Sequence, residues 1–582
     1  MKLRVLPAIG LTTLAAHAGP ASAGGLFLPG SGAISTSRAG AAVASVDDGE
    51  ALSINPAGLA KTTGWTLTIS AAITRYYMSF NRNGAYDEPA FAVDRQGYEG
   101  TPFEPVENDP KPPLGIGSFQ PIPVIAVVTD LGDRVKGLRL AAGLYAPNGY
   151  PFRDMSQGYT SSPARFLDNT ACQGSGCVAP PPTRYDTLTS ESTALFPSIA
   201  AAYRITPMLD VGARFSAGNA KAKTQVMVWG TTNNVDESVR NDTLADLDVK
   251  DGFIPTFGLG FTLRPTPFLE IGAVYNSAAA FKLQGRSLST KGPSVDAVKV
   301  VGPIEDNDVG DRVRCRASGD FGVGEAVPAC ISLQLPQTAT VGVRYKKLDS
   351  YGRLRGDIEL NAGWENWGKT CDFDTEAGIK KNQDCTSPGQ FLVNLDAGLY
   401  VNGTFTEALQ VNTVNLGLQD VYTLRLGGSY IIPVNDGSAD AAGWPNKIIL
   451  RGGIGYDTQA ARDGFLRASF DGAARTTATI GAAYKTPKWE LSLGGGVVFE
   501  GTNENPNTGV DADGNPTGEP CNPTPSDPTG CGDGTFTPIE DRTGPDPTNP
   551  LIAPEVQTQN PFNQGTIKSH YVLFMLGYNR FW

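Results

Sequence analysis

Five arginines stand on the polar side of stretches in which apolar and polar residues alternate: Arg139, Arg214, Arg344, Arg425 and Arg451. A guanidinium group stays charged and presents a planar set of donors, so it can bind a carboxylate through two hydrogen bonds. One or two of these arginines could therefore hold an acidic small molecule. The alternative is that they pair with carboxylates of the protein itself, such as Asp210, Glu270 and Glu490.

Residues for acid–base or nucleophilic catalysis are scarce. His570 is the only histidine outside the first 23 residues, and the chain has neither a G-x-S-x-G elbow nor a phosphate-binding loop. The run Asp511-Ala512-Asp513-Gly514-Asn515 partly matches a calcium loop, but its glycine comes too early and no glutamate closes it at the required spacing. We expect a solvated acidic loop there, and neither an enzyme nor a metal or cofactor site.

Both ends of the chain indicate export to an outer membrane. Lys2 and Arg4 precede a short apolar stretch and the small residues Ala21-Ser22-Ala23, which predicts a cleaved signal peptide over residues 1–23. The chain ends in an alternating segment that stops at the aromatic Trp582. The closing strand of a bacterial outer-membrane barrel ends in this way, with an aromatic residue at the membrane interface, where the barrel assembly machinery reads it.

The eight cysteines form four close pairs: Cys172 with Cys177, Cys315 with Cys330, Cys371 with Cys385 and Cys521 with Cys531. An even number of cysteines in an exported chain indicates disulfide bonds. Zinc is the alternative, but the pairs lack C-x-x-C spacing and one histidine remains after cleavage. The sequence therefore predicts four local disulfides.

Period-2 alternation recurs along the chain and predicts fourteen strands. They lie near residues 65–81, 116–129, 136–147, 193–204, 208–228, 252–264, 268–284, 331–347, 352–368, 420–432, 446–457, 474–485, 488–500 and 568–582. Short connections alternate with long ones, which hold or border all four cysteine pairs. Five prolines are expected at or near the starts of strands that follow long loops: Pro121, Pro123, Pro197, Pro255 and Pro336. Short periplasmic turns, long external loops and an even strand count are typical of an outer-membrane barrel.

Composition agrees with this fold. The formal charge of −12 becomes −14 without Lys2 and Arg4, which argues against nucleic acid as a partner. No stretch after Gly24 approaches 18 consecutive apolar residues, so no transmembrane helix is expected. A soluble β-sandwich or propeller would explain the alternation of apolar and polar residues. It would not explain the signal peptide, the terminal aromatic residue and the alternation of short and long connections together. We predict an all-β transmembrane antiparallel barrel over residues 64–582.

Residues 24–63 carry no strand pattern and are expected either to hang free in the periplasm or to fill the lumen as a plug. Their run Ser37-Arg38-Ala39-Gly40 … Asp47-Asp48 … Asn55-Pro56-Ala57 resembles the N-terminal hatch of the FadL family of outer-membrane transporters for long-chain fatty acids and aromatic hydrocarbons. Further similar runs are Tyr145-Ala146-Pro147-Asn148-Gly149, Phe196 to Arg204, Leu335 to Gly342 and Trp364-Glu365-Asn366-Trp367. The long cysteine-bearing loops, the terminal Trp582 and the charged Arg580 depart from the family pattern.

The resemblance implies a monomeric barrel that passively transports hydrophobic molecules past lipopolysaccharide and releases them sideways into the membrane. Residues 24–63 would then form a moving hatch in the lumen, with Arg38, Asp47, Asp48, Asn55, Pro56 and Ala57 as its family-like residues, and Ala146, Pro147, Asn148 and Gly149 would belong to the gap in the wall. The inward arginines would be candidates for a fatty-acid carboxylate. A surface adhesin or purely structural barrel is the alternative function, and the sequence does not name the substrate.

Overall fold

The computed structural model describes residues 27–83, 86, 98, 101–149, 151–157, 179–229, 242–291, 298–301, 315, 326–371, 375–376, 379–380, 385–401, 404–408, 412–434, 444–462, 466–469, 472–505, 508–510, 516–520 and 565–582. Outside them lie the predicted signal peptide, the acidic run at 511–515, and the pairs Cys172/Cys177 and Cys521/Cys531. Among the helices of the described residues, none is long and apolar enough to cross a membrane.

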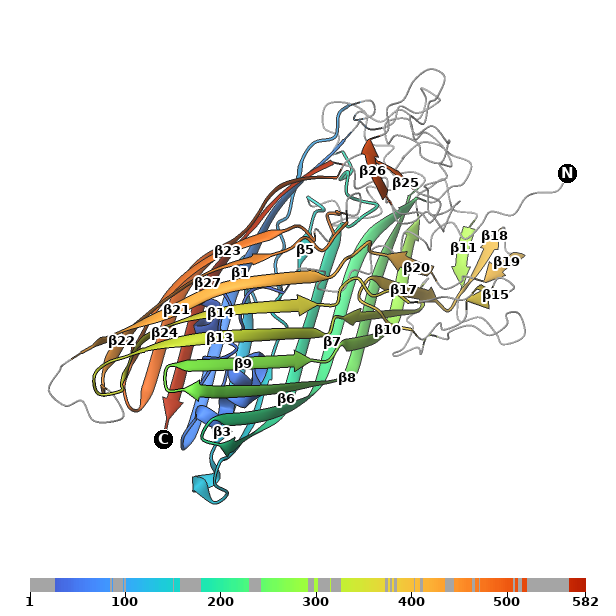
Figure 1. Ribbon diagram of the computed structural model, residues 1–582. Helices are drawn as coiled ribbons and strands as arrows, with labels where there is room; N and C mark the ends of the chain where they lie inside the picture. The colour runs from blue at the N-terminus through green and yellow to red at the C-terminus, as the bar shows by residue number, and fades with distance from the viewer. Residues whose placement is uncertain are drawn as a thin grey trace.

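Fourteen antiparallel strands of the described chain close into a tilted cylinder (Figure 1). In this count, two consecutive strands that are separated only by a short break are taken as one strand. In chain order they are β1 (Trp65–Arg82), β3 (Gln120–Thr129), β4 (Leu138–Tyr145), β6 (Thr189–Thr206), β7 (Leu209–Trp229), β8 (Asp242–Thr266), β9 (Leu269–Asn276) continued by β10 (Ala279–Lys291), β12 (Ala326–Leu335) continued by β13 (Thr338–Leu348), β14 (Leu354–Glu365), β21 (Val421–Pro433), β22 (Lys447–Asp457), β23 (Arg475–Lys485), β24 (Trp489–Asn505) and β27 (Gly565–Phe581). The last strand pairs with the first from Thr66–Phe581 to Arg82–Gly565 and closes the ring.

The alternation of the sequence becomes the two faces of this wall. On β21, the Leu424 side chain is 54% exposed on the outside, whereas Thr423 is 8% exposed on the inside. Exposed large apolar side chains recur on the outward positions of the other strands, as a lipid-facing belt requires. The predicted barrel is confirmed, and its short turns fall within a few residues of their predicted positions.

The strands reach farther at their loop ends than predicted. β8 begins at Asp242 rather than near 252, and β12 at Ala326 rather than near 331. Pro255 and Pro197 therefore lie inside long strands, and Pro336 lies between β12 and β13. The expectation that they stand at or near strand starts is wrong for Pro255 and Pro197, because the sheet continues beyond the belt where the amphipathic pattern fades.

Shorter strands complete the outer part of the molecule. They are β2 (Val106–Glu107), β5 (Arg153–Asp154), β11 (Val298–Val301), β15 (Thr375–Glu376), β16 (Ile379–Lys380), β17 (Gln390–Leu395), β18 (Gly398–Val401), β19 (Thr404–Ala408), β20 (Asn412–Asn415), β25 (Thr508–Val510) and β26 (Pro516–Pro520). β17 pairs with β12 and β20 pairs with β17, so these two short strands extend the sheet beside β12. The disulfides Cys315–Cys330 and Cys371–Cys385 form in this region.

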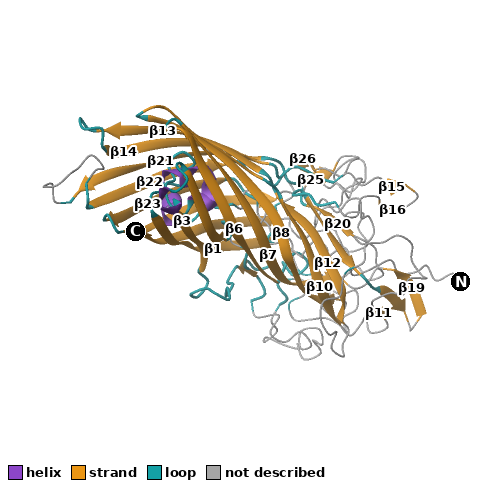
Figure 2. Cartoon of the chain, turned by 90° about the horizontal axis from the view of Figure 1, so that it is seen from below, coloured by secondary structure: helices purple, strands orange, loops and turns teal. Residues whose placement is uncertain are grey.

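The described part of the N-terminal segment, residues 27–63, lies inside the ring of strands (Figure 2). It contains the short helices α2 (Ala33–Thr36) and α3 (Ala51–Ile54) and the 3-10 helix η1 (Pro56–Lys61); η3 (Leu131–Asp133) is a turn of the wall. We call residues 27–63 the hatch segment. It contacts β1 and β27 on one side and β6, β7 and β8 on the other, so it crosses the lumen.

Candidate functional site

The Asn-Pro-Ala run of the hatch segment docks on glycines of the wall. Asn55 caps η1 by accepting a hydrogen bond from the Ala57 N–H at 3.1 Å, and its amide donates to the Val43 carbonyl at 2.8 Å. A Cβ at Gly260 would collide with the Asn55 side chain, and one at Gly212 with the backbone at Ala57. The Asn-Pro-Ala run can therefore pack this closely only against wall residues without a Cβ, that is, against glycines.

Arg38 ties the hatch segment to β14. Its guanidinium lies 3.1 Å from the Asp357 carboxylate and 3.4 Å from that of Glu359, while its Nε donates to the Ala41 carbonyl at 2.8 Å. All three charged side chains are buried. A buried ion pair is costly to break, because removing one partner leaves the other charge uncompensated.

The Asp357 carboxylate is also one end of a row of alternating charges along the inner wall. Arg344 lies 2.6 Å from Asp357 and 2.6 Å from Glu270, and Arg264 joins Glu270 at 3.1 Å to Asp210. Arg204 ends the row at 2.8 Å from Asp210. The row runs from β6 to β14 and continues through Arg38 into the hatch segment.

Two of the three acids of the hatch segment, Asp48 and Glu50, are buried against β1 and β27. The Glu50 carboxylate accepts hydrogen bonds from the Ile34 and Ser35 N–H groups at 2.9 Å and from the Ser70 hydroxyl of β1 at 2.9 Å. The Asp48 carboxylate accepts one from the Asn579 amide of β27 at 2.8 Å. Burial, followed by the proximity of Glu50, raises the pKa of Asp48 well above its ordinary value. Asp47 is exposed beside them.

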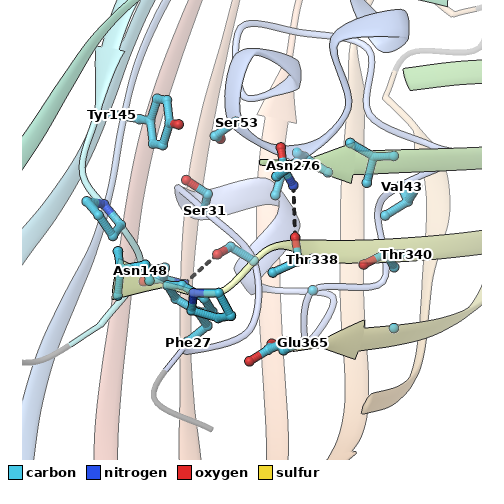
Figure 3. A pocket seen from close by; sticks show the side chains of 18 of the residues that line it. Phe27, Ser31, Val43, Ser53, Tyr145, Asn148, Asn276, Thr338, Thr340 and Glu365 are labelled. Carbon is cyan, nitrogen blue, oxygen red and sulfur yellow. Dashed lines mark hydrogen bonds between the residues drawn. The ribbon is translucent and has the colours of Figure 1, made fainter. Parts of the chain in front are cut away.

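A cavity of about 230 Å³ lies between the hatch segment and the wall (Figure 3). The hatch contributes Phe27, Leu28, Gly30, Ser31, Gly40, Val43, Ser53 and Ile54. The wall contributes apolar and polar residues from several strands, among them Tyr145, Ala146, Pro147, Asn148, Phe196, Arg214, Asn276, Thr338, Trp364, Glu365 and Arg425. A mostly apolar pocket with a few placed polar groups is typical of a small-molecule site.

Asn148 fastens the beginning of the hatch segment to the wall. Its side-chain amide donates to the carbonyl of Leu28 at 2.9 Å, and the backbone carbonyl of Asn148 accepts from the Leu28 N–H at 2.6 Å. The same amide also reaches the carbonyls of Pro29 and Gly30. The ladder between β3 and β4 ends here at Val124–Tyr145, and beyond it the Ala146 N–H donates to the Pro123 carbonyl at 3.1 Å. Three of the four predicted gap residues, Ala146, Pro147 and Asn148, line the cavity; Gly149 does not.

Two of the five candidate arginines pair with the acids weighed in the sequence analysis. Arg344 pairs with Glu270, and Arg451 lies 2.6 Å from Glu490. Neither lines the cavity beside Asn148; both line a smaller polar pocket of about 100 Å³ on another side of the hatch segment. The third of those acids, Asp210, is paired with Arg204 and Arg264 instead.

Two further arginines also have protein partners. Arg139 lies at the end of the hatch segment, where its Nε donates to the Thr62 carbonyl at 2.8 Å. Arg425 lines the cavity and is 3.1 Å from the Asp457 carboxylate.

Arg214 differs from Arg344, Arg425 and Arg451, which pair with carboxylates, and from Arg139, which does not line the cavity. It is 5% exposed and lines the cavity, and no carboxylate pairs with it among the described residues. One guanidinium nitrogen donates to the Leu52 carbonyl at 2.9 Å and another to the Asn276 side chain at 2.9 Å. Its Nε has no hydrogen-bond partner in the described structure. Of the five, Arg214 is therefore the arginine with charge and a donor to offer to a molecule in the cavity.

The sequence analysis did not single out Asn276, and it did not indicate the contact that Asn148 makes with the hatch segment. Asn148 was expected only as part of a gap, since nothing in the sequence tells that its amide meets the hatch. Asn276 lies at the end of β9, where it donates to the Thr338 hydroxyl at 3.2 Å (Figure 3). A polar residue ending an apolar alternation on an inward position was the available signal.

Comparison with known proteins decides the family. Residues 181–513, more than half of the chain, match the family described as outer membrane protein transport protein (OMPP1/FadL/TodX). This chain belongs to that family. It is therefore an outer-membrane transport protein and not an enzyme, in agreement with the sequence analysis.

Solved structures agree with the fold of this FadL-family chain. A FadL homologue from Pseudomonas aeruginosa has a TM-score of 0.57 at 12% identity, with 96% of this chain and 99% of the homologue covered. The toluene transporter TodX from Pseudomonas putida has a TM-score of 0.51 at 13% identity, covering 96% of this chain and all of TodX. At such identities the likeness concerns the fold alone. No curated protein sequence matches this chain significantly.

Proposed function

We propose that this FadL-family barrel passively carries hydrophobic molecules across the outer membrane through the luminal cavity. The observation that carries this proposal is the position of the cavity, with the beginning of the hatch segment on one side and the end of the β3–β4 ladder at Tyr145 on the other. A molecule there would touch both the part that blocks the lumen and the part of the wall where we propose the gap. FadL and TodX relatives supply the expectation of a hydrophobic cargo.

The outer lumen also favours transport over the adhesin alternative. A large cluster of buried apolar side chains continues from the cavity toward the long-loop end, and includes Phe152, Met155, Leu333, Phe391 and Leu466. A barrel that served only to present polar loops would have no need of an apolar lining. A hydrophobic molecule captured outside would meet apolar side chains before it reached Tyr145.

We propose a hydrophobic acid, such as a long-chain fatty acid, as the cargo. A buried guanidinium without a carboxylate partner is unfavourable, and an anionic head group near Arg214 would compensate it. The Nε of Arg214 provides the free donor. The apolar chain would then extend along Phe196, Ile54 and Leu335, which also line the cavity.

In this mechanism the hatch segment moves away from Asn148, and the cargo leaves sideways near residues 146–149. A disulfide between Leu28→Cys and Asn148→Cys would lock the two sides, since their backbones are already hydrogen-bonded to each other. We expect the oxidised double variant to lose uptake, while each single variant keeps most of it. Full uptake by the oxidised double variant would contradict hatch movement at this place.

The direct test is uptake of a labelled long-chain fatty acid by cells that lack their own outer-membrane transporter, with and without this protein. Uptake above the control would support the proposal. If the protein is folded in the membrane and neither the acid nor a labelled aromatic hydrocarbon enters, the transport proposal is wrong and the adhesin alternative becomes the one to pursue.

A further inference from the structure

The ladder between β8 and the strand formed by β9 and β10 is interrupted once. Pairing of β8 with β9 ends at Gly258–Asn276 and pairing of β8 with β10 begins at Lys250–Gln284. Residues 251–257 and 277–283 between these points form no ladder pairs with one another. On their other sides β8 pairs with β7, with a register shift between Gly218 and Ala220, and β10 pairs with β12 from Ala279 onward.

The edge of β8 at this break has its backbone donors satisfied without a partner strand. The Phe257 carbonyl accepts from the Ser277 N–H at 2.9 Å, so Phe257, and with it Pro255 and Phe253, turns its backbone groups toward the break. The Phe257 N–H donates to the Ser277 hydroxyl at 2.9 Å, and the Phe253 N–H to the Asp251 carboxylate at 3.0 Å. Pro255 has no N–H to satisfy.

Such an edge is unusual at membrane depth. Unpaired backbone groups facing hydrocarbon are costly, and irregular backbone is tolerated there only where it is buried in protein or lines a cavity. The second oxygen of Asp251 accepts from the Lys282 N–H at 2.8 Å and so caps the outer end of the break. The sequence thus supplies a proline and two side-chain acceptors where a closed wall would need neither.

The break lies between the cavity and the outer surface of the barrel. On its inner side Thr256, Ser277 and Ala279 line the cavity. On its outer side Phe253 is 63% and Phe257 46% exposed. The exposed Lys250 and Lys282 stand at its outer end, so it lies at the margin where the apolar belt gives way to charged residues.

We propose that this break is a lateral port through which apolar molecules pass between the luminal cavity and the hydrocarbon of the outer leaflet. It is separate from the gap proposed near residues 146–149, which follow the end of β4. The proposal rests on the proposed function in one respect, that the cavity holds the transported molecule. Its occupant is any lipid-dissolved apolar chain, because Phe253, Phe257 and Ala279 offer it no charge.

Thiol labelling from the membrane tests the port directly. Ala279→Cys and Thr340→Cys both line the cavity, but the ladders on both sides of Thr340 are unbroken. In lipid vesicles we expect a membrane-dissolved maleimide to label Ala279→Cys several-fold faster than Thr340→Cys. Ala280→Cys, which is exposed on the outside, gives the rate for a lipid-facing residue, and the unsubstituted protein gives the background. Equal rates for Ala279→Cys and Thr340→Cys would overturn the proposal.

Uptake separates the port from the proposed function. Ala279→Trp would fill the port, whereas Ala280→Trp places the same side chain in lipid. We expect uptake to fall several-fold in the first variant and to stay unchanged in the second. If the unsubstituted protein imports the acid and both variants equal it, the port is wrong and the proposed function stands. If the unsubstituted protein imports nothing, the proposed function is wrong, and the labelling rates alone decide whether the port exists.

Discussion

At the scale of single residues, Arg214 gives the strongest reason to expect an anionic cargo. Arg344, Arg425 and Arg451 are neutralised by acids of the wall, so a ligand would have to displace a carboxylate to reach them. Arg214 is held by carbonyl and amide oxygens instead, which fix its position without cancelling its charge. A positioned and uncompensated cation is the arrangement that favours an anionic head group.

We therefore predict that Arg214→Gln lowers uptake of a long-chain fatty acid about tenfold, because one charge-assisted hydrogen bond contributes about 1.5–3 kcal/mol. Uptake of an uncharged aromatic hydrocarbon should not fall. Both are measured as initial rates in the same cells, with Arg451→Gln as the control for loss of a luminal arginine outside the cavity. An equal loss for both cargoes would mean that Arg214 is structural.

Asp48 gives a prediction about pH. Its raised pKa means that the folded protein keeps a proton that the unfolded chain releases above the ordinary value of 3.8. Stability should therefore fall as pH rises from 3.8 toward the raised value. Asp48→Asn cannot ionise, so we expect a flatter dependence of melting temperature on pH between about 4 and 8. The exposed Asp47→Asn is the matched control, and an unchanged slope in Asp48→Asn would contradict this assignment.

At the scale of elements, the hatch segment packs against glycines of β21 to β23. A Cβ at Gly453 would collide with the backbone of Arg38, while the nearest atom to one at Gly452 is the Thr479 carbonyl oxygen at 3.7 Å. We predict that Gly453→Ala destabilises the docked hatch segment by about 1–3 kcal/mol, as overpacking does, and that Gly452→Ala is nearly neutral. Protease protection of the hatch segment in the folded barrel measures both. Equal protection would show that the hatch segment can shift without cost.

The row of buried charges between β6 and β14 gives a second prediction at this scale. Glu270→Gln leaves Arg264 and Arg344 without one of their acids, and we expect the free energy of unfolding to fall by about 3 kcal/mol. Asp248→Asn removes an acid from a partly exposed pair with Lys221 and should cost at most about 1 kcal/mol. Urea titration of the barrel in lipid vesicles compares the two. Similar losses would mean that the row does not stabilise the wall.

At the scale of the whole molecule, the barrel could be predicted because each strand has one face toward lipid and one toward the lumen, so apolar and polar residues alternate along it. Tyr422 to Tyr430 shows this in full. The outer parts of β8 and β12 were missed because, beyond the lipid-facing belt, both faces of a strand contact protein or water. The alternation of apolar and polar residues is therefore weaker there. The residue pattern alone left the hatch segment open between lumen and periplasm, and only the family resemblance predicted the lumen. Its small residues have no periodicity and are positioned by glycines such as Gly212 and Gly260 from distant strands.

The candidate site was foreseen only in part. Strand parity placed Arg214 and Arg425 on the inner face, and both line the cavity. Parity cannot tell which arginine lacks an acidic partner, because partners such as Asp457 come from a neighbouring strand whose register is set by the whole sheet. The contact of Asn148 with Leu28 joins residues far apart in the chain, and no local pattern records it.

The pairing of β1 with β27 also governs how the molecule forms. These strands come from opposite ends of the barrel sequence and are matched over 17 residues, so the ring stays open until the last strand has been made. Contacts of such long range are slow to form. Until then β1 and β24 are bare edges, open to pairing with other chains. The Asn579 amide of β27 also donates a hydrogen bond to Asp48, so the final strand both closes the barrel and completes the binding surface for the hatch segment.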